Sequence, residues 1–209
     1  SSRCEVITGM KASIAVNDLN MDFHIDSPFT YTASNIRVDT AEVRMPHRFY
    51  TFQILQAGMD FSREVFRADS IRIIPDFSKL EFGKKYGYEI DRYEGIIPFI
   101  NARHLSLSDT SGIKAGIAEI QFYLKVFRDK RLPFLNKKKL LPQDLLRDFP
   151  LNVLIDSLKV TKSYVEYEEY AEGTMEPGKI FFDNLYAVLH NVNNVSPSGN
   201  TTLSAKAYL

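Results

Sequence analysis

The sequence predicts a mostly β fold: an elongated or curved antiparallel sheet, or an open β-sandwich, with at most one or two short helices. Three observations support this class. Apolar and polar residues alternate with a period of two along most of the chain. Phe and Tyr are plentiful, at 15 and 11 residues, while Trp is absent, and aromatic and β-branched residues favour strands. Gly, Asn, Asp, Ser or Pro separates most of the alternating segments.

The clearest strand is predicted at "IAEIQFYLKVF", residues 117–127. Its apolar residues Ile120, Phe122, Leu124 and Val126 share one parity, which is typical of a half-buried strand. Further strands are expected at 22–25, 36–45, 49–61, 65–74, 86–107, 151–167, 180–190 and 201–209. The segments "SDTSG" at 108–112 and "EGTMEPG" at 172–178 are predicted turns.

Helical signal is weak along the whole chain. The best candidate is "PQDLLRDF" at 142–149, which starts at Pro142 and is stopped by Pro150. We therefore predict a β-rich region over 1–128, a basic connector with a short helix over 129–150, and a second β-rich region over 151–209 that continues the same sheet. A segment that covers one face of the sheet is the alternative for 129–150. Together the regions form one structural domain, truncated at its C-terminus.

One short pattern recurs along the chain. "ADSIRII" at 68–74 and "IDSLKVT" at 155–161 share Asp-Ser-apolar-basic-apolar. Looser copies occur at 33–39, 102–108 and 182–188. Short polar side chains bond to nearby backbone, so we interpret each copy as a turn at the entry to a strand.

Composition argues against several classes of function. Lys plus Arg equals Asp plus Glu at 26 each, so no overall field attracts nucleic acid and no nucleic-acid partner is expected. The single cysteine, Cys4, allows neither an intrachain disulfide nor a cysteine metal site. No apolar run is long enough for a membrane helix and no leader opens the chain. The chain starts without Met and stops inside a strand pattern, so we expect a longer protein.

The residues most suited to chemistry are the carboxylates of Glu166, Glu168 and Glu169. Two carboxylates across a cleft could hydrolyse a glycoside. In a strand, however, Glu166 and Glu168 share a face, which we interpret as the solvated face. The four histidines are isolated and "DTSG" at 109–112 lacks a second copy. We therefore expect no catalytic residue, no metal site and no cofactor.

A stripe of apolar side chains on one face of many strands remains. Its expected members are Ile71, Ile73, Leu105, Leu107, Phe122, Leu124, Leu158, Val160, Phe181 and Leu185. In a closed sandwich this stripe would be core. In an open, curved sheet it would line a groove for phospholipid or other acyl chains.

Two segments carry a resemblance to a known family. "LNVLIDSLKVTKSYVEYEEYAEGTMEPGKIFFDNLYAVLHNVNN" at 151–194 resembles a segment of the AsmA-like proteins of Gram-negative bacteria, especially Bacteroidetes members. "FRADSIRIIPDFSKLEFGKKYGYEIDRYEGIIPFINARHLSL" at 66–107 is similar to an upstream segment of such proteins. The resemblance covers a little over a third of the chain. It implies a β-rich periplasmic protein, anchored to the inner membrane outside this chain, with a non-enzymatic role in phospholipid transport or outer-membrane upkeep.

Two alternatives belong to other classes of function. An exported β-sandwich that binds a glycan or a protein partner would have a closed core and exposed aromatics at one rim, for which Tyr86, Tyr88 and Tyr93 are candidates. A hydrolase would use the carboxylates of 166–169. The sequence does not distinguish an open sheet from a closed one, and this distinction separates the first alternative from the lipid hypothesis.

Overall fold

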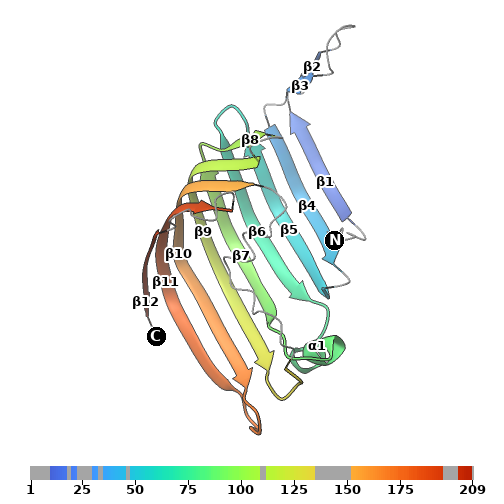
Figure 1. Ribbon diagram of the computed structural model, residues 1–209. Coiled ribbons are helices and arrows are strands. Elements are labelled where there is room, and N and C mark those ends of the chain that lie inside the picture. The colour runs from blue at the N-terminus through green and yellow to red at the C-terminus, as the bar shows by residue number, and fades with distance from the viewer. Residues whose placement is uncertain are drawn as a thin grey trace.

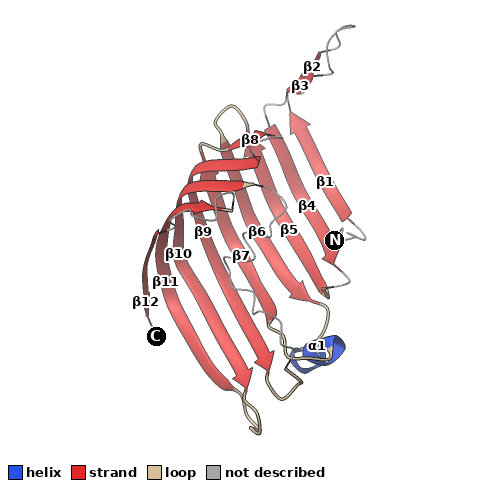
Figure 2. Ribbon diagram, viewed as in Figure 1, coloured by secondary structure: helices blue, strands red, loops and turns tan. Residues whose placement is uncertain are grey.

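The computed structural model describes residues 10–17, 20–22, 30–32, 35–45, 48–108, 112–134, 152–194 and 202–208. Figure 1 shows one broad, curved sheet with a helix at its lower end. Strands dominate the described residues, and α1 (Lys79–Tyr86) is the only helix among them (Figure 2). The sheet is not closed, because its two end strands, β1 and β12, do not pair with each other. The predicted class, a mostly β open and curved sheet, is confirmed.

The large sheet has ten strands in the order β1-β4-β5-β6-β7-β9-β10-β11-β12, with β8 paired to β9. Their bounds are β1 (Met10–Asn17), β4 (Asn35–Met45), β5 (Tyr50–Asp60), β6 (Val65–Pro75), β7 (Arg92–Arg103), β8 (Ser106–Ser108), β9 (Gly112–Asp129), β10 (Val153–Tyr170), β11 (Gly178–Asn193) and β12 (Thr202–Tyr208). β2 (Asn20–Asp22) and β3 (Thr30–Thr32) form a separate two-stranded ribbon. No strand was predicted at β1.

Neighbouring strands are antiparallel with one exception: β9 and β10 run parallel. A parallel pair needs a crossover that returns the chain to the end where the first strand began. The chain between these two strands contains the basic connector. The helix expected at 142–149 lies outside the described residues. β10, β11 and β12 extend the same sheet as the strands before the connector.

Helix α1 lies at residues 79–86, where we expected no helix, and the strand predicted from 86 begins only at Arg92. Ser78 precedes the helix, and its backbone N–H donates a hydrogen bond to the Glu81 carboxylate. This is a capping box. Gly87 ends the helix in the left-handed conformation at φ 78°, which glycine adopts without steric cost. The Ser-x-x-Glu pattern followed by glycine was present in the sequence, and it is the signal that could have found α1.

The apolar alternation is unbroken in the middle of β9, where Ala118, Ile120, Phe122 and Leu124 follow at every second position. Six other strands contain one extra residue at the same level of the sheet. It lies within residues 38–41 of β4, 54–57 of β5, 68–71 of β6, 97–100 of β7, 160–163 of β10 and 182–185 of β11. On one side of this level Ala118 and Ile120 pair with apolar residues of both neighbouring strands, and on the other side Leu124 pairs with Gly95 and Val165. The insertion therefore keeps the apolar side chains on one face.

These extra residues behave as β-bulges. The register shifts where a strand with an insertion meets one without it, as between β7 and β9 and between β9 and β10. Pro98 lies in the shifted part of β7, and a bulge is where a strand tolerates a proline. Ser163 Oγ accepts the Phe122 backbone N–H at 3.0 Å, replacing a ladder bond. Lys162 and Asn184 have positive φ there. Bulges bend strands, so an aligned row of them bends the sheet.

A second row of insertions lies nearer the upper ends of the later strands. It falls within residues 102–105, 115–118, 155–158 and 189–192, and His104 and Asn191 there have positive φ. Figure 1 shows the upper ends of β9, β10 and β11 turned across the sheet. The recurring Asp-Ser pattern marks these bends, because the pairs at 69–70 and 156–157 lie inside β6 and β10. The interpretation of these two as strand-entry turns is wrong.

The small core lies under the second row of bends. Met59, Ala102, Leu105, Ala115 and Ala118 are buried together there. Three of them are register neighbours across the sheet through the pairs 59–66, 66–102 and 102–118. Elsewhere most apolar side chains of the strands are only half-buried, as expected for a single layer of sheet.

Candidate functional site

The side of the sheet that carries Ala118, Ile120, Phe122, Leu124 and their register partners is called the apolar face below. In its lower half a hollow of about 220 Å³ is lined by apolar and aromatic residues alone. Ile73, Ile97, Phe122 and Leu124 line it from β6, β7 and β9. Ile96 and Tyr123, which by their register belong to the opposite face, border it as well. The described residues form one large sheet and one small ribbon, so within them no second sheet covers this face.

The structure gathers part of the predicted apolar stripe at this hollow. Ile73, Phe122 and Leu124 line it, and Ile71 is the register partner of Ile97 beside it. The remaining members lie elsewhere. Leu105 belongs to the small core and Leu158 packs against it. Val160 is buried, and Leu185 is the register partner of Ser163. Leu107 pairs through its backbone with Ile113, and its side chain lies outside the described residues.

Phe181 lies on the opposite face from the rest of the stripe. It is the register partner of Glu166 and is 46% exposed. Phe182 is the register partner of Val165, which in turn pairs with Leu124 of the apolar face. The extra residue within 182–185 changes the parity, so counting back by twos from Leu185 selects the wrong phenylalanine. The sequence signal for Phe182 is the break "FDNL", in which two apolar residues stand three apart.

Helix α1 closes the lower end of the sheet with an aromatic cluster. Phe82 is 1% exposed, and its ring lies 5.2 Å from that of Tyr50, 5.3 Å from Tyr86 and 6.5 Å from Phe49. The Tyr93 backbone N–H donates to Tyr50 Oη at 2.8 Å. Burial raises the pKa of Tyr50 to about 12, because a tyrosinate would lose its hydration there.

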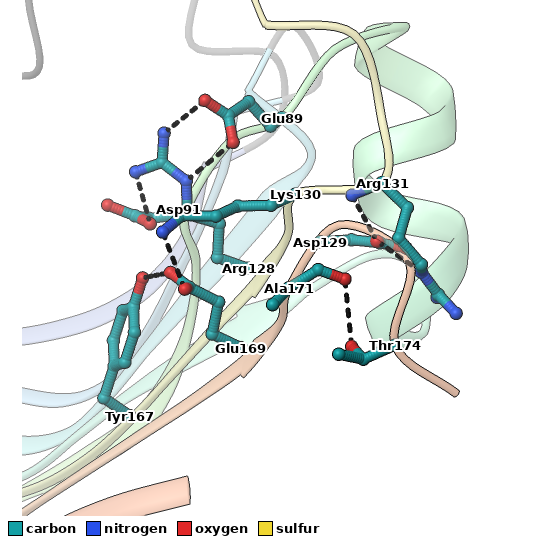
Figure 3. A network of polar contacts seen from close by, with 10 residues as sticks. All are labelled: Glu89, Asp91, Arg128, Asp129, Lys130, Arg131, Tyr167, Glu169, Ala171 and Thr174. Atoms are coloured by element: carbon teal, nitrogen blue, oxygen red, sulfur yellow. Dashed lines mark hydrogen bonds and ion pairs between the residues drawn. The ribbon is translucent and has the colours of Figure 1, made fainter. Parts of the chain in front are cut away.

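A network of charged side chains lies beside this cluster (Figure 3). Arg128 pairs with Glu89 at 3.0 Å and with Asp91 at 3.3 Å, and the three side chains are only 12%, 8% and 15% exposed. Burial opposes the charge of Arg128, yet the two carboxylates outweigh it and raise its pKa. Tyr167 donates to Glu169 at 2.6 Å. Because Tyr167 is the register partner of Val126, the network bounds the apolar face at this end.

The glutamates of β10 are ion-paired rather than solvated, which corrects the prediction of a wet face. Glu166 is 8% exposed; Lys179 approaches it at 3.2 Å and Tyr164 donates to it at 2.8 Å. Glu168 pairs with Lys79 of α1. The neighbouring strand β11 supplies Lys179, so the sequence of β10 alone did not reveal this burial.

The protonation of these glutamates argues against the hydrolase alternative. Burial favours the neutral form of Glu166, but the hydrogen bonds from Tyr164 and Lys179 outweigh it and lower its pKa. Hydrogen bonds from Lys130 and Tyr167 likewise outweigh burial and lower the pKa of Glu169. A glycosidase needs one carboxyl with a raised pKa as the general acid. Neither of these two carboxyls meets that requirement.

Acid should weaken the fold through Glu166 and Glu169. A carboxyl whose folded pKa lies below its unfolded value of about 4.3 stabilises the fold above that value. This stabilisation is lost as the pH falls through the folded pKa. We expect the free energy of unfolding to drop below about pH 4.3, and to drop less steeply in E166Q/E169Q. Urea unfolding between pH 6 and pH 2 measures both curves, and parallel curves would contradict the expectation.

The tyrosines expected at an exposed rim belong to the end of the sheet near α1. Tyr86 and Tyr88 contact each other with ring centroids 5.7 Å apart, and Tyr86 Oη donates to the Arg48 carbonyl. Burial raises the pKa of Tyr93. All three tyrosines are therefore partly buried, and they do not form a free aromatic rim.

Metal sites and membrane-spanning helices were also sought among the described residues. Within it, no group of three or more His, Cys, Asp or Glu side chains could hold a metal ion. His104 and His190 are the two described histidines; His104 follows β7, and His190 lies in β11. No helix among the described residues is long and apolar enough to cross a membrane.

Comparisons with known proteins add no further identification. A scan against protein-family models, a search of curated proteins and a search of solved structures each found no match to this chain.

Proposed function

We propose that this chain is a non-enzymatic, periplasmic segment of an AsmA-like protein, and that its apolar face holds acyl chains of phospholipid. The observation that supports the proposal most directly is the row of bulges. Each bulge inserts one residue, and together they keep apolar side chains on one face while the sheet bends. Such a bent row of apolar side chains offers a surface along which an acyl chain can lie.

The energetics of this mode of binding are passive. An acyl chain on the apolar face leaves water, which is worth about 0.8 kcal/mol per buried CH₂. The hollow beside Phe122 and Leu124 suits an acyl chain, because its lining contains only apolar and aromatic residues. No catalytic group is required, which agrees with the ionised and paired state of Glu166 and Glu169.

The family resemblance supports the same proposal from the sequence. The bends of β6 and β10 coincide with "ADSIRII" and "IDSLKVT", which lie in the two segments that resemble AsmA-like proteins. In such proteins the membrane contact would be made by an anchor outside this chain. The proposed role is therefore to carry or shield lipid during outer-membrane upkeep.

A charge placed in the hollow should abolish acyl binding. We expect L124D to weaken binding of a fluorescent fatty acid at least tenfold, about 1.4 kcal/mol, because the carboxylate would lie against the acyl chain. The matched control is I117D on the same strand, since Ile117 is exposed and lies on the other face. Fluorescence titration measures the binding, and circular dichroism checks that both variants fold.

Two results would reject the proposal for this chain. The first is gently extracted wild-type protein that carries no lipid in native mass spectra and does not bind the fatty acid. The second is equal loss of binding in L124D and I117D, which would show that the effect is not specific to the apolar face.

A further inference from the structure

The face opposite the apolar face carries a second, larger groove of about 460 Å³. It is called the tyrosine groove here. Its lining residues come from β6, β7, β9 and β10, and those used below are Arg72, Glu94, Ile96, Tyr123, Lys125 and Tyr164. Ile73, Ile96 and Tyr123 also border the hollow of the apolar face, because a single layer of sheet separates the two. The proposed function makes no use of it, because acyl chains would lie on the other side of the sheet.

The groove runs across the strands. Arg72, Ile96, Tyr123 and Tyr164 are successive register partners on four neighbouring strands. Strands lie about 4.8 Å apart, so this row is about 14 Å long. The next row toward α1 contains Glu94, Lys125 and Glu166 in the same order of strands. The groove therefore has an aromatic and apolar row beside a charged row.

The two tyrosine rings are held in place by their hydroxyl groups. Tyr164 Oη donates to Glu166 at 2.8 Å, and Gln121 Nε2 donates to Tyr123 Oη at 2.7 Å. Phe181 stacks on Tyr164 with ring centroids 6.3 Å apart and planes 27° apart. Tyr123 is nevertheless 42% exposed. These contacts fix the rings at their polar edge and leave ring surface for a ligand, at little cost in conformational entropy.

Arg72 lies at one end of the aromatic row. It is exposed, and within the described part of the chain it has no hydrogen bond or ion pair. A guanidinium offers donors in a fork that matches a carboxylate. Lys125 adds a second cation. Glu94 accepts from Arg92 Nη1 at 2.9 Å through one carboxylate oxygen, and its side chain is 51% exposed, so its other oxygen remains for a ligand. The groove thus has a cation at one end of its aromatic row, and a donor and an acceptor in the row beside it.

We propose that the tyrosine groove binds an acidic oligosaccharide of two or three sugar units. The length of the row suits such a ligand. The apolar CH face of each sugar would lie on Tyr123 or Tyr164, its hydroxyl groups would bond to Glu94 and Lys125, and a carboxylate would pair with Arg72. An acyl chain has no group that uses donors and acceptors along its length, so this groove and the apolar face select different chemistry.

The test uses the purified chain and two trisaccharides of equal length. Trigalacturonate should bind at least tenfold more tightly than neutral maltotriose by isothermal titration calorimetry. Y123A and R72Q should each weaken trigalacturonate binding at least tenfold. The matched controls are Y186A and R67Q, an exposed tyrosine on β11 and an exposed arginine on β6 outside the groove, and each should change binding less than twofold.

Three results would overturn the proposal: no binding of trigalacturonate, binding that the Y123A and R72Q variants leave intact, or displacement of the trisaccharide by a fatty acid. The L124D variant separates the two proposals, because it should lose fatty-acid binding and keep trigalacturonate binding. Loss of both ligands in L124D would contradict the assignment of two independent faces.

Discussion

Replacing Phe82 by alanine is expected to lower the free energy of unfolding by about 4 kcal/mol. Phe82 is the largest fully buried side chain among the described residues. Its removal deletes the apolar contact with Tyr50, Tyr86 and Phe49 and leaves a cavity that the sheet cannot fill, because the rings are held by separate strands and the helix. Urea unfolding followed by fluorescence or circular dichroism measures the change.

Leu80 provides the matched control on the same helix. It is 42% exposed, so L80A should cost less than about 1 kcal/mol. A similar loss in F82A and L80A would show that α1 contributes through its helical structure and not through the aromatic cluster. The prediction also requires that F82A leave the strands intact, which the far-ultraviolet circular dichroism of the folded variant checks.

The second large effect is expected for Arg128. R128M should cost about 3 kcal/mol, because it leaves the carboxylates of Glu89 and Asp91 buried without their cation. The additional substitution E89Q removes one of the two unpaired carboxylates and should recover part of the lost stability. R128M/E89Q should therefore be more stable than R128M. Urea unfolding of the single and double variants measures this coupling.

An exposed ion pair gives the control for this prediction. Arg37 pairs with Asp39 on the surface, and R37M should change the free energy of unfolding by less than about 0.5 kcal/mol. A cost for R128M as small as that for R37M would show that water reaches the Arg128 network. Comparing the costs of R128M and R37M therefore tests whether the Arg128 network at the end of the apolar face is buried.

The strand content was predictable because alternation is a local property. In β9 the alternation of Ile120, Phe122 and Leu124 with polar residues shows directly that these three side chains share one face of the sheet. Helix α1 was missed although Ser78 and Glu81 form a capping box, because the prediction relied on periodicity and the helix is only eight residues long. A short helix is identified by its ends, since it has too few turns to display a period.

The candidate site was predictable in part. Ile73, Phe122 and Leu124 were selected from parity, and the structure places them around one hollow. Phe181 was assigned to the wrong face because a bulge lies between it and Leu185. The row Arg72, Ile96, Tyr123 and Tyr164 was not recognised, because its members come from four strands and meet only through the register.

The sequence by itself determined that the chain forms strands, where most of them lie and which residues alternate toward one face. It also contained some of the bends, as pairs of polar residues between apolar ones at 69–70, 156–157 and 183–184. Only the tertiary structure decided that these pairs align into rows, that β9 and β10 run parallel, and that the sheet stays open. The reason is that strand pairing joins residues far apart in the chain, and the register of each pair depends on its neighbours.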